Sequence, residues 1–290
     1  VLLAKESIKL LNSNVLILEK NLNETTKIYE NGLGDEESVE QLQITLSSIK
    51  SSLNKTQRLK NMAYQLLNIT LGLNIDNPTN LTDSLESLTL QNMSLELLET
   101  ENKIENSIDY QIAENDKAAK ALLVKLEQSR ALPTLSSFIT GSYIGNNDKF
   151  RFLNDDQIWV GTAAFGFNLD IPIFGSGLKS ARTQRAKINL EKAKDDLTET
   201  EQKIKLQIEA AKSDYQFSIE EYENKKENLN LSERIERKNQ TKFFEGIASS
   251  FELRQAQTQL YSSQQEFLQA MLDVINNKAA LETVLNTVNN

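Results

Sequence analysis

Apolar positions along the chain follow two different periods. In most of the sequence they recur every three or four residues, the spacing of a helix that buries one stripe against a neighbouring helix. Between Pro133 and Ile171 they alternate with other residues instead, which is the period of a strand. The pattern predicts a mainly α-helical chain of long coiled-coil hairpins that carries one β-hairpin.

The predicted β-hairpin has one apolar face. In its second strand this face is formed by Trp159, Gly161, Ala163, Phe165, Phe167, Leu169 and Ile171. The opposite face becomes polar at Asn168 and Asp170, and the polar stretch 146–156 is expected to be a loop to the less regular first strand. A lone two-stranded hairpin is marginally stable in water, so it needs a packed helix, a partner sheet or a barrel closed by several chains. The pattern alone leaves these possibilities open.

Glycine, proline and asparagine divide the helical regions. The expected helices are, in order, 1–29, 35–71, 94–131, 176–244 with Ser176 as its N-cap, and a last one that carries Leu253 to Leu285. Gly32 and Gly246 are expected to end the helices before them, because glycine accepts the left-handed backbone that stops a helix. The stretch 72–89 is rich in turn-forming residues and is expected to be a break.

The two helical hairpins repeat each other in sequence. The segment Thr26–Leu33 resembles Thr241–Ile247 with one residue inserted, and beyond it the apolar positions Val39, Leu46 and Leu71 match Leu253, Leu260 and Leu285. The second repeat has a strand pair before its long helix, and the first has none. The first residues, from Val1 onward, also have the pattern of the middle of an amphipathic helix, without a capping residue. We therefore expect the sequence to be truncated at its N-terminus, with the first strand pair upstream.

Composition excludes several classes of chemistry. The 290 residues include no cysteine and no histidine, so a thiol nucleophile, a disulfide, an imidazole base and the usual zinc sites are excluded. The net charge of −9 argues against nucleic-acid binding, and no apolar stretch is long enough for a transmembrane helix. Paired carboxylates such as Asp195 and Asp196 lie where a solvated helix face is expected. No enzyme, cofactor or metal site is predicted.

The chain resembles the TolC-like outer membrane efflux protein family. The resemblance rests on Leu132-Pro133 before the first strand, Trp159-Val160-Gly161 at the second, the segment Pro172–Gly177 after it, and the two glycine tips. These motifs occur in order, with the duplication, and cover essentially the whole chain. The missing first half of the first repeat is the departure from the family pattern.

The resemblance implies a homotrimer in the outer membrane of a Gram-negative bacterium, with a periplasmic extension. Each protomer would give its strands to a shared β-barrel and its helices to an α-barrel tunnel. Trp159, Phe165, Phe167 and Leu169 would then face lipid. A periplasmic adaptor protein, itself bound to an inner-membrane transporter, would dock on the helix tips at Gly32, Leu33, Gly246 and Ile247.

The resemblance also places a periplasmic aperture just after the tips. The family's acidic pair falls on Glu252 and Gln255 after the second tip, of which only Glu252 is acidic here, and the matching positions after the first tip are Ser38 and Gln41. Glu252 has an alternative explanation, because a carboxylate in a first helical turn also complements the helix dipole. Both explanations remain open at the level of sequence.

The implied function is a passive exit duct of a tripartite efflux or type I secretion system, for drugs, other small molecules or polypeptides. The alternative is a soluble coiled-coil scaffold or interaction protein on which the β-hairpin is a minor addition. The expected divisions of the chain are 1–72, the helical hairpin of the first repeat; 73–132, an equatorial segment and helix; 133–174, the barrel hairpin; and 175–290, the helical hairpin of the second repeat.

Overall fold

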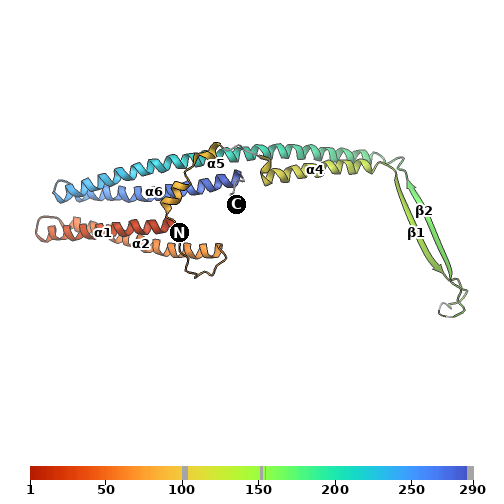
Figure 1. Ribbon diagram of the computed structural model, residues 1–290, viewed down its shortest axis with the longest axis horizontal. Coiled ribbons are helices and arrows are strands. Elements are labelled where there is room, and N and C mark those ends of the chain that lie inside the picture. The colour runs from red at the N-terminus through yellow and green to blue at the C-terminus, as the bar shows by residue number, and fades with distance from the viewer. Residues whose placement is uncertain (100–103, 151–152, 154, 286–290) are drawn as a thin grey trace. The chain divides into compact units, whose positions relative to one another are not determined.

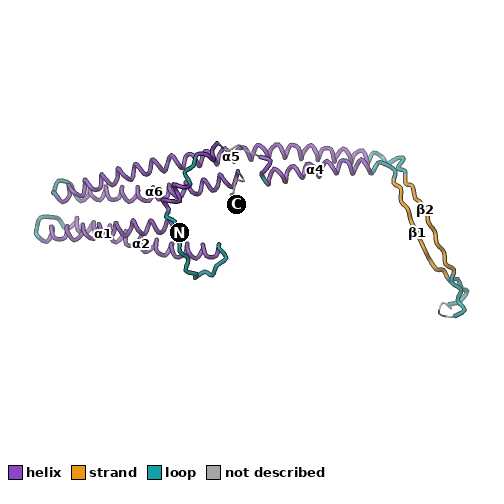
Figure 2. Tube along the Cα trace, viewed as in Figure 1, coloured by secondary structure: helices purple, strands orange, loops and turns teal. Residues whose placement is uncertain are grey.

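The computed structural model describes residues 1–99, 104–150, 153 and 155–285, and it is mainly helical with one antiparallel β-hairpin, as the sequence pattern predicts (Figures 1 and 2). The elements are α1 Leu2–Glu30, α2 Glu36–Thr70, α3 Leu85–Gln91, 3₁₀ turns Leu95–Glu99 and Ile104–Asn106, α4 Ile108–Ser129, β1 Thr134–Ile144, β2 Val160–Asp170, α5 Leu178–Phe244 and α6 Ser250–Leu285. No helix among these residues is long and apolar enough to cross a membrane.

The chain divides into two compact units. Unit 1 comprises Val1–Lys103 and Leu206–Asn290, and unit 2 comprises Ile104–Lys205. The long helix α5 therefore contributes its last part to unit 1 and its first part to unit 2.

Unit 1 contains two helical hairpins, α1–α2 and the end of α5 with α6, and α1 contacts α6. The predicted heptad stripe of α2 is buried at Val39, Leu42 and Leu46, and Leu42 and Leu46 pack with Leu18 of α1. In the second hairpin Tyr215 and Tyr222 of α5 pack against Met271, Val274 and Leu281 of α6 in a larger cluster. The 3–4 spacing seen in the sequence thus marks the buried seams, which supply most of the stabilisation of such helices.

The segment between α2 and α4 differs from the sequence-based expectation. The expected break at 72–89 ends in helix α3, and the expected helix 94–131 begins only at Ile108. Tyr215 explains part of the difference: its hydroxyl donates to Asn92 O at 2.5 Å and accepts from Ser94 N at 3.0 Å. The same hydroxyl lies 3.0 Å from the carbonyl oxygen of Ser94, which a helix beginning at Ser94 would use for its own first hydrogen bond. Residues 100–103 of the expected helix lie outside the described part of the chain.

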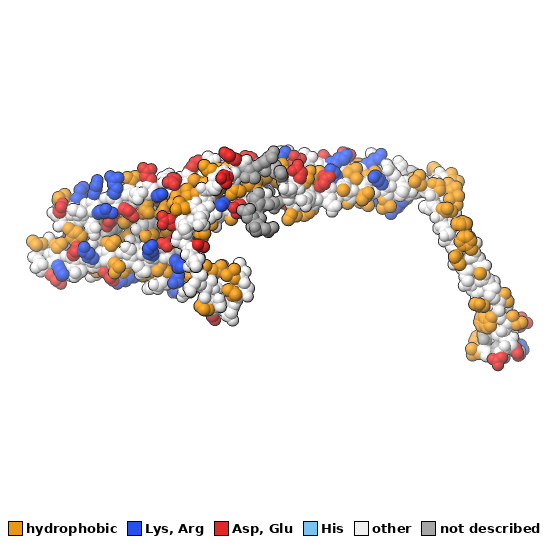
Figure 3. Space-filling model, in the orientation of Figure 1, with side chains coloured by type: hydrophobic (Ala, Val, Ile, Leu, Met, Phe, Trp, Pro, Cys, Tyr) orange, Lys and Arg blue, Asp and Glu red, His pale blue; other side chains and the backbone are white. Residues whose placement is uncertain are grey.

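Unit 2 carries the β-hairpin. β1 and β2 pair antiparallel over their full lengths, with Ser137 opposite Phe167 and Ile139 opposite Phe165. Partners that face each other across an antiparallel pair lie on the same side of the sheet, so the apolar face predicted from the alternation is present. Figure 3 shows hydrophobic side chains running along this hairpin.

The start of α5 corrects a second expectation. Ser176 is not the N-cap, because the helix begins two residues later at Leu178 and Ser176 lies in the preceding turn with φ 51°. The first helical hydrogen bond runs from Ala181 N to the carbonyl of Gly177, whose φ is 78°. Two consecutive residues with positive φ make a sharp turn, and the glycine tolerates that backbone without steric cost.

Candidate functional site

The tips of the two helical hairpins have the same backbone structure. After α1, Gly32 N donates to Tyr29 O at 2.8 Å and Leu33 N donates to Ile28 O at 3.0 Å. After α5, Gly246 N donates to Phe243 O at 3.0 Å and Ile247 N donates to Lys242 O at 2.8 Å. Both patterns are Schellman motifs, in which a left-handed residue satisfies the last carbonyl groups of a helix. Gly32 and Gly246 have φ values of 73° and 72°, as this motif requires.

Each tip presents one exposed apolar side chain. Leu33 is 82% exposed and Ile247 is 70% exposed. In a Schellman motif the residue after the glycine commonly packs back on its own helix. At these two tips the side chains stand in solvent instead, where a partner protein can reach them.

Glu252 forms a capping box at the start of α6. Its Oε2 accepts hydrogen bonds from Ser249 N at 2.8 Å and from Ser249 Oγ at 3.0 Å, and Glu252 N donates to Ser249 Oγ at 3.3 Å. These bonds favour the ionised carboxylate, so they hold the pKa of Glu252 below its ordinary value, with the backbone bond as the largest cause. Glu252 nevertheless remains exposed. Glu252 can therefore cap α6 and at the same time present its negative charge to the solvent.

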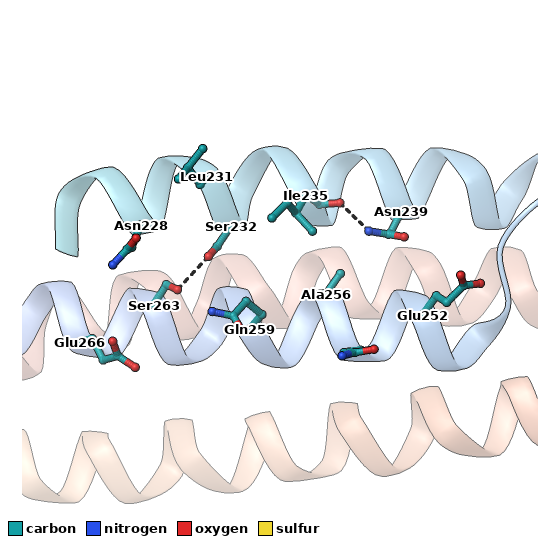
Figure 4. A pocket seen from close by; sticks show the side chains of 11 residues that line it. Asn228, Leu231, Ser232, Ile235, Asn239, Glu252, Ala256, Gln259, Ser263 and Glu266 are labelled. Atoms are coloured by element: carbon teal, nitrogen blue, oxygen red, sulfur yellow. Dashed lines mark hydrogen bonds between the residues drawn. The ribbon is translucent and has the colours of Figure 1, made fainter. Parts of the chain in front are cut away.

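A groove of about 630 Å³ runs between α5 and α6 and begins at Glu252 (Figure 4). Gln255 also lines it, as do Asn228, Leu231, Ser232, Ile235, Asn239, Ala256, Gln259, Ser263 and Glu266. Across the groove the hydroxyl groups of Ser232 and Ser263 are hydrogen-bonded at 2.8 Å. At the far end Glu266 accepts from Lys225 of α5 at 3.2 Å. The groove thus has both polar and apolar lining, with a carboxylate at each end.

The positions that match Glu252 and Gln255 after the first tip are less exposed. Ser38 is only 4% exposed, and its backbone N–H donates to Asp35 Oδ1 at 2.6 Å, which caps α2. Gln41 is half-buried and donates from Nε2 to Glu37 Oε1 at 2.7 Å. Of the four residues that the family resemblance assigns to an aperture, Glu252 and Gln255 are the two on an open surface.

A polar seam in the interior of unit 1 was not predicted from the sequence. Asn14 of α1 donates to Gln264 of α6 at 2.8 Å, and Gln240 of α5 donates to Asn21 of α1 at 2.8 Å. Gln257, which is 1% exposed, lies beside Glu236. Burial raises the pKa of Glu236 above its ordinary value, and the neighbouring Gln257 side chain lowers it by a smaller amount. The sequence nevertheless contains a signal for this polar seam. Asn14, Leu18, Asn21 and Thr25 recur at the heptad spacing of one buried stripe, so polar residues alternate with the apolar ones along it.

The apolar residues assigned to lipid lie on open surface. Phe165, Phe167 and Leu169 are on one face of β2 with exposures of 64%, 67% and 58%, and Trp159, just before the strand, is 52% exposed. On the other face Ser142 and Thr162 share a hydrogen bond of 2.9 Å. Within the described ranges no group of three or more acidic side chains is placed to hold a metal ion.

Comparisons with known proteins identify the fold. A family model described as "Outer membrane efflux protein" matches residues 101–287. The solved structure of VceC from Vibrio cholerae shares the fold with a TM-score of 0.75 and 16% identity, over 98% of this chain and 66% of that chain. CusC gives a TM-score of 0.81 and 19% identity over 98% of this chain and 65% of that chain. CmeC from Campylobacter jejuni gives a TM-score of 0.68 and 17% identity, over 98% of this chain and 59% of that chain.

The chain spans about two thirds of the length of the solved chains VceC and CusC. A search of curated proteins found no match.

Proposed function

Because the chain belongs to the outer membrane efflux protein family, we propose that it is the outer-membrane channel of a tripartite efflux or type I secretion system. It passively conducts drugs, other small molecules or polypeptides across the periplasm and outer membrane of a Gram-negative bacterium. Three copies form the duct, a periplasmic adaptor binds the helix tips, and an inner-membrane transporter supplies the energy. Catalysis has no part in this function, since the family comprises passive channels.

The β-hairpin carries the proposal. Its strands are 11 residues long each, and a tilted strand of about 9–11 residues crosses the hydrocarbon core of a bilayer. One face is lined by Phe165, Phe167 and Leu169, and the other has Thr162 and Asn168. Because a bilayer cannot hold unpaired strand edges, such hairpins must close into a barrel across copies, with the aromatic face toward lipid and the polar face toward water.

The helix tips and the groove at Glu252 supply the periplasmic end of the proposed duct. Leu33 and Ile247 are the exposed apolar contacts for the adaptor, and Gly32 and Gly246 hold them in place. Glu252 and Gln255 face the aperture, with Ser38 and Gln41 at the corresponding height on α2. The division into 1–72, 73–132, 133–174 and 175–290 then corresponds to first tip, equator, barrel and second tip.

A soluble coiled-coil scaffold is the competing function, and two measurements separate them. The channel is expected to require detergent for extraction from cell envelopes, and to give uniform ion conductance steps in planar lipid bilayers. A protein that is released by salt washing and never conducts would overturn the channel proposal and favour the scaffold.

A further inference from the structure

A pocket of about 230 Å³ lies within unit 1, where its two helical hairpins meet. Its walls come from three helices, through residues in 3–14 of α1, 49–56 of α2 and 261–269 of α6. The helix α1 contacts both α2 and α6. The pocket shares no described residue with the groove that begins at Glu252. Because both hairpins contribute to its walls, the pocket is a product of their packing.

The lining of this pocket is partly apolar and carries no charge. Its aliphatic residues are Leu3, Leu10, Leu11, Ile49 and Leu268. Aspartate, glutamate, lysine and arginine make up 25% of the sequence, yet none of them is among the described residues that line the pocket. A charged ligand would lose hydration here without gaining a counter-ion. The lining therefore favours an uncharged molecule.

A buried pair of amides belongs to the same lining. Asn14 is 4% exposed and Gln264 is 9% exposed, and Asn14 Nδ2 donates to Gln264 Oε1 at 2.8 Å. This bond uses one end of each amide. It leaves Oδ1 of Asn14 as an acceptor and Nε2 of Gln264 as a donor. A purely apolar ligand would take water from such groups without replacing its hydrogen bonds, so the ligand needs polar atoms of its own.

Tyr261 adds an aromatic wall. It packs against the cluster of Leu18, Leu42 and Leu46. Burial, more than the nearby charge of Glu236, raises the pKa of its hydroxyl above the ordinary value, so the residue stays neutral at physiological pH. Aromatic rings pair favourably with one another, which makes a flat ring a suitable ligand body.

The volume of the pocket suits a single substituted ring. An apolar cavity of about 150 Å³ holds benzene, and pockets of about 300–1,000 Å³ hold drug-sized ligands. At about 230 Å³ this pocket lies between these sizes.

We propose that this pocket binds a small uncharged aromatic carboxamide, a flat ring that carries one donor and one acceptor side by side. The carbonyl group of the ligand accepts from Gln264 Nε2, and its amide donates to Asn14 Oδ1. The ring lies among Ile49, Tyr261 and Leu268. A ligand in this place contacts both hairpins, so it stabilises their packing by binding only the folded arrangement. The inference rests on unit 1 alone and goes beyond the proposed channel function.

Three probes of similar size test the ligand class by fluorine NMR: para-fluorobenzamide, the anion para-fluorobenzoate and the apolar para-fluorotoluene. The full chain is held in lipid nanodiscs, and empty nanodiscs measure how much of each probe enters lipid. The benzamide is expected to bind saturably, with a dissociation constant about tenfold or more below those of the other two, because the anion lacks a counter-ion and the toluene lacks hydrogen-bonding atoms. Equal affinities for the three probes, or no saturable binding of the benzamide, would overturn the proposal.

Two neighbouring serines of α2 test the location. Ser52 is half-buried and lines the pocket, whereas Ser51 is exposed and lies outside it. Ser52→Trp fills the pocket and is expected to abolish saturable binding of para-fluorobenzamide. Ser51→Trp is the matched control and is expected to bind as the natural chain does. Retained binding in a folded Ser52→Trp variant would overturn the proposed location.

Gln264→Met tests the amide contact and decides the matter if Ser52→Trp does not fold. Methionine keeps an unbranched side chain of similar length and removes the hydrogen-bonding atoms. The variant is expected to raise the dissociation constant of para-fluorobenzamide about tenfold and to leave that of para-fluorotoluene unchanged. A variant that merely loosened the helices would weaken both probes alike. Equal weakening of both probes, or unchanged binding of the benzamide, would overturn the proposal.

Discussion

Gln240 of α5 donates from Nε2 to Oδ1 of Asn21 of α1 at 2.8 Å, and this bond joins the two helical hairpins of unit 1. Asn21 is fully buried, and its Nδ2 has no hydrogen-bond partner among the described residues. The interface between the two repeats therefore includes polar groups that are only partly satisfied. Such groups lower stability compared with an apolar seam, and they make the packing depend on single bonds.

Asn21→Ala is expected to destabilise the protein by about 1–3 kcal/mol, because it leaves the Gln240 amide without its acceptor. The double variant Asn21→Leu with Gln240→Leu removes both partners and is expected to cost less than the sum of the two single leucine variants. Urea unfolding of the four proteins in a double-mutant cycle measures the coupling. A coupling energy of zero would mean that the two side chains do not interact in solution.

Glu236→Gln is expected to raise the unfolding temperature at about pH 7.5. Burial raises the pKa of Glu236 in the folded protein above its ordinary value of 4.5. For a carboxyl group with a raised folded pKa, the contribution to stability is complete below pH 4.5 and is lost as pH rises through the folded value. Glutamine does not ionise, so the advantage of the variant should disappear as pH falls toward 4.5.

The control for this measurement is Glu227→Gln, which removes an exposed carboxylate from the same helix and changes the net charge equally. An unfolding temperature for Glu236→Gln that stays below wild type at neutral pH would show that the carboxylate is needed in the interior.

Gly32→Ala and Gly246→Ala are each expected to cost about 1–2 kcal/mol, because alanine in a left-handed conformation is sterically strained. A Cβ at either position would meet no atom within 4 Å, so the expected cost comes from the backbone alone. Gly175→Ala is the matched control, since its backbone is not left-handed and the nearest atom to a Cβ is Lys179 Cγ at 3.9 Å. Urea unfolding should separate the tip variants from the control, and equal stability of all three would contradict the Schellman assignment.

Local patterns predicted those parts of the fold that local interactions determine. The alternation around Phe165 and Phe167 predicted the face that pairs with Ile139 and Ser137, because strand period and sheet face are linked residue by residue. Heptad spacing likewise predicted the buried seams. The interruption at Ser94 could not be predicted, since Tyr215, far away in the sequence, supplies the bonds that hold it.

For the candidate site, sequence spacing indicates the local contact of Glu252 but not the burial of the matching residue on α2. Ser249 three residues before Glu252 is a capping-box spacing, so the bond between them was accessible from sequence. The burial of Ser38, which is 4% exposed, has no such local sequence signal.

Phe167→Arg is expected to damage barrel assembly more than Asn168→Arg. The two residues are adjacent in β2 and lie on opposite faces. On the proposed lipid face a cation near the midplane costs roughly 2–4 kcal/mol, whereas a cation on the water-filled side mainly changes ion selectivity. Heat-modifiable mobility on gels measures assembly in outer membranes. Equal assembly of both variants would remove the assignment of the aromatic face to lipid.

Glu252→Gln tests whether the carboxylate at the start of α6 acts on permeating ions or only caps its helix. Glutamine can accept the same hydrogen bond from Ser249 N, so the variant keeps the capping geometry and removes only the charge. In the proposed trimer three Glu252 carboxylates would ring the aperture, and a ring of negative charge favours cations. The variant is therefore expected to lower cation preference, measured as the reversal potential of single channels under a salt gradient, with a smaller change in conductance at high salt. Glu266→Gln, at the other end of the same groove, controls for loss of one carboxylate per chain outside the proposed ring. If Glu252→Gln leaves the reversal potential unchanged, the carboxylate serves α6 alone, since its hydrogen bonds with Ser249 already explain why it is ionised.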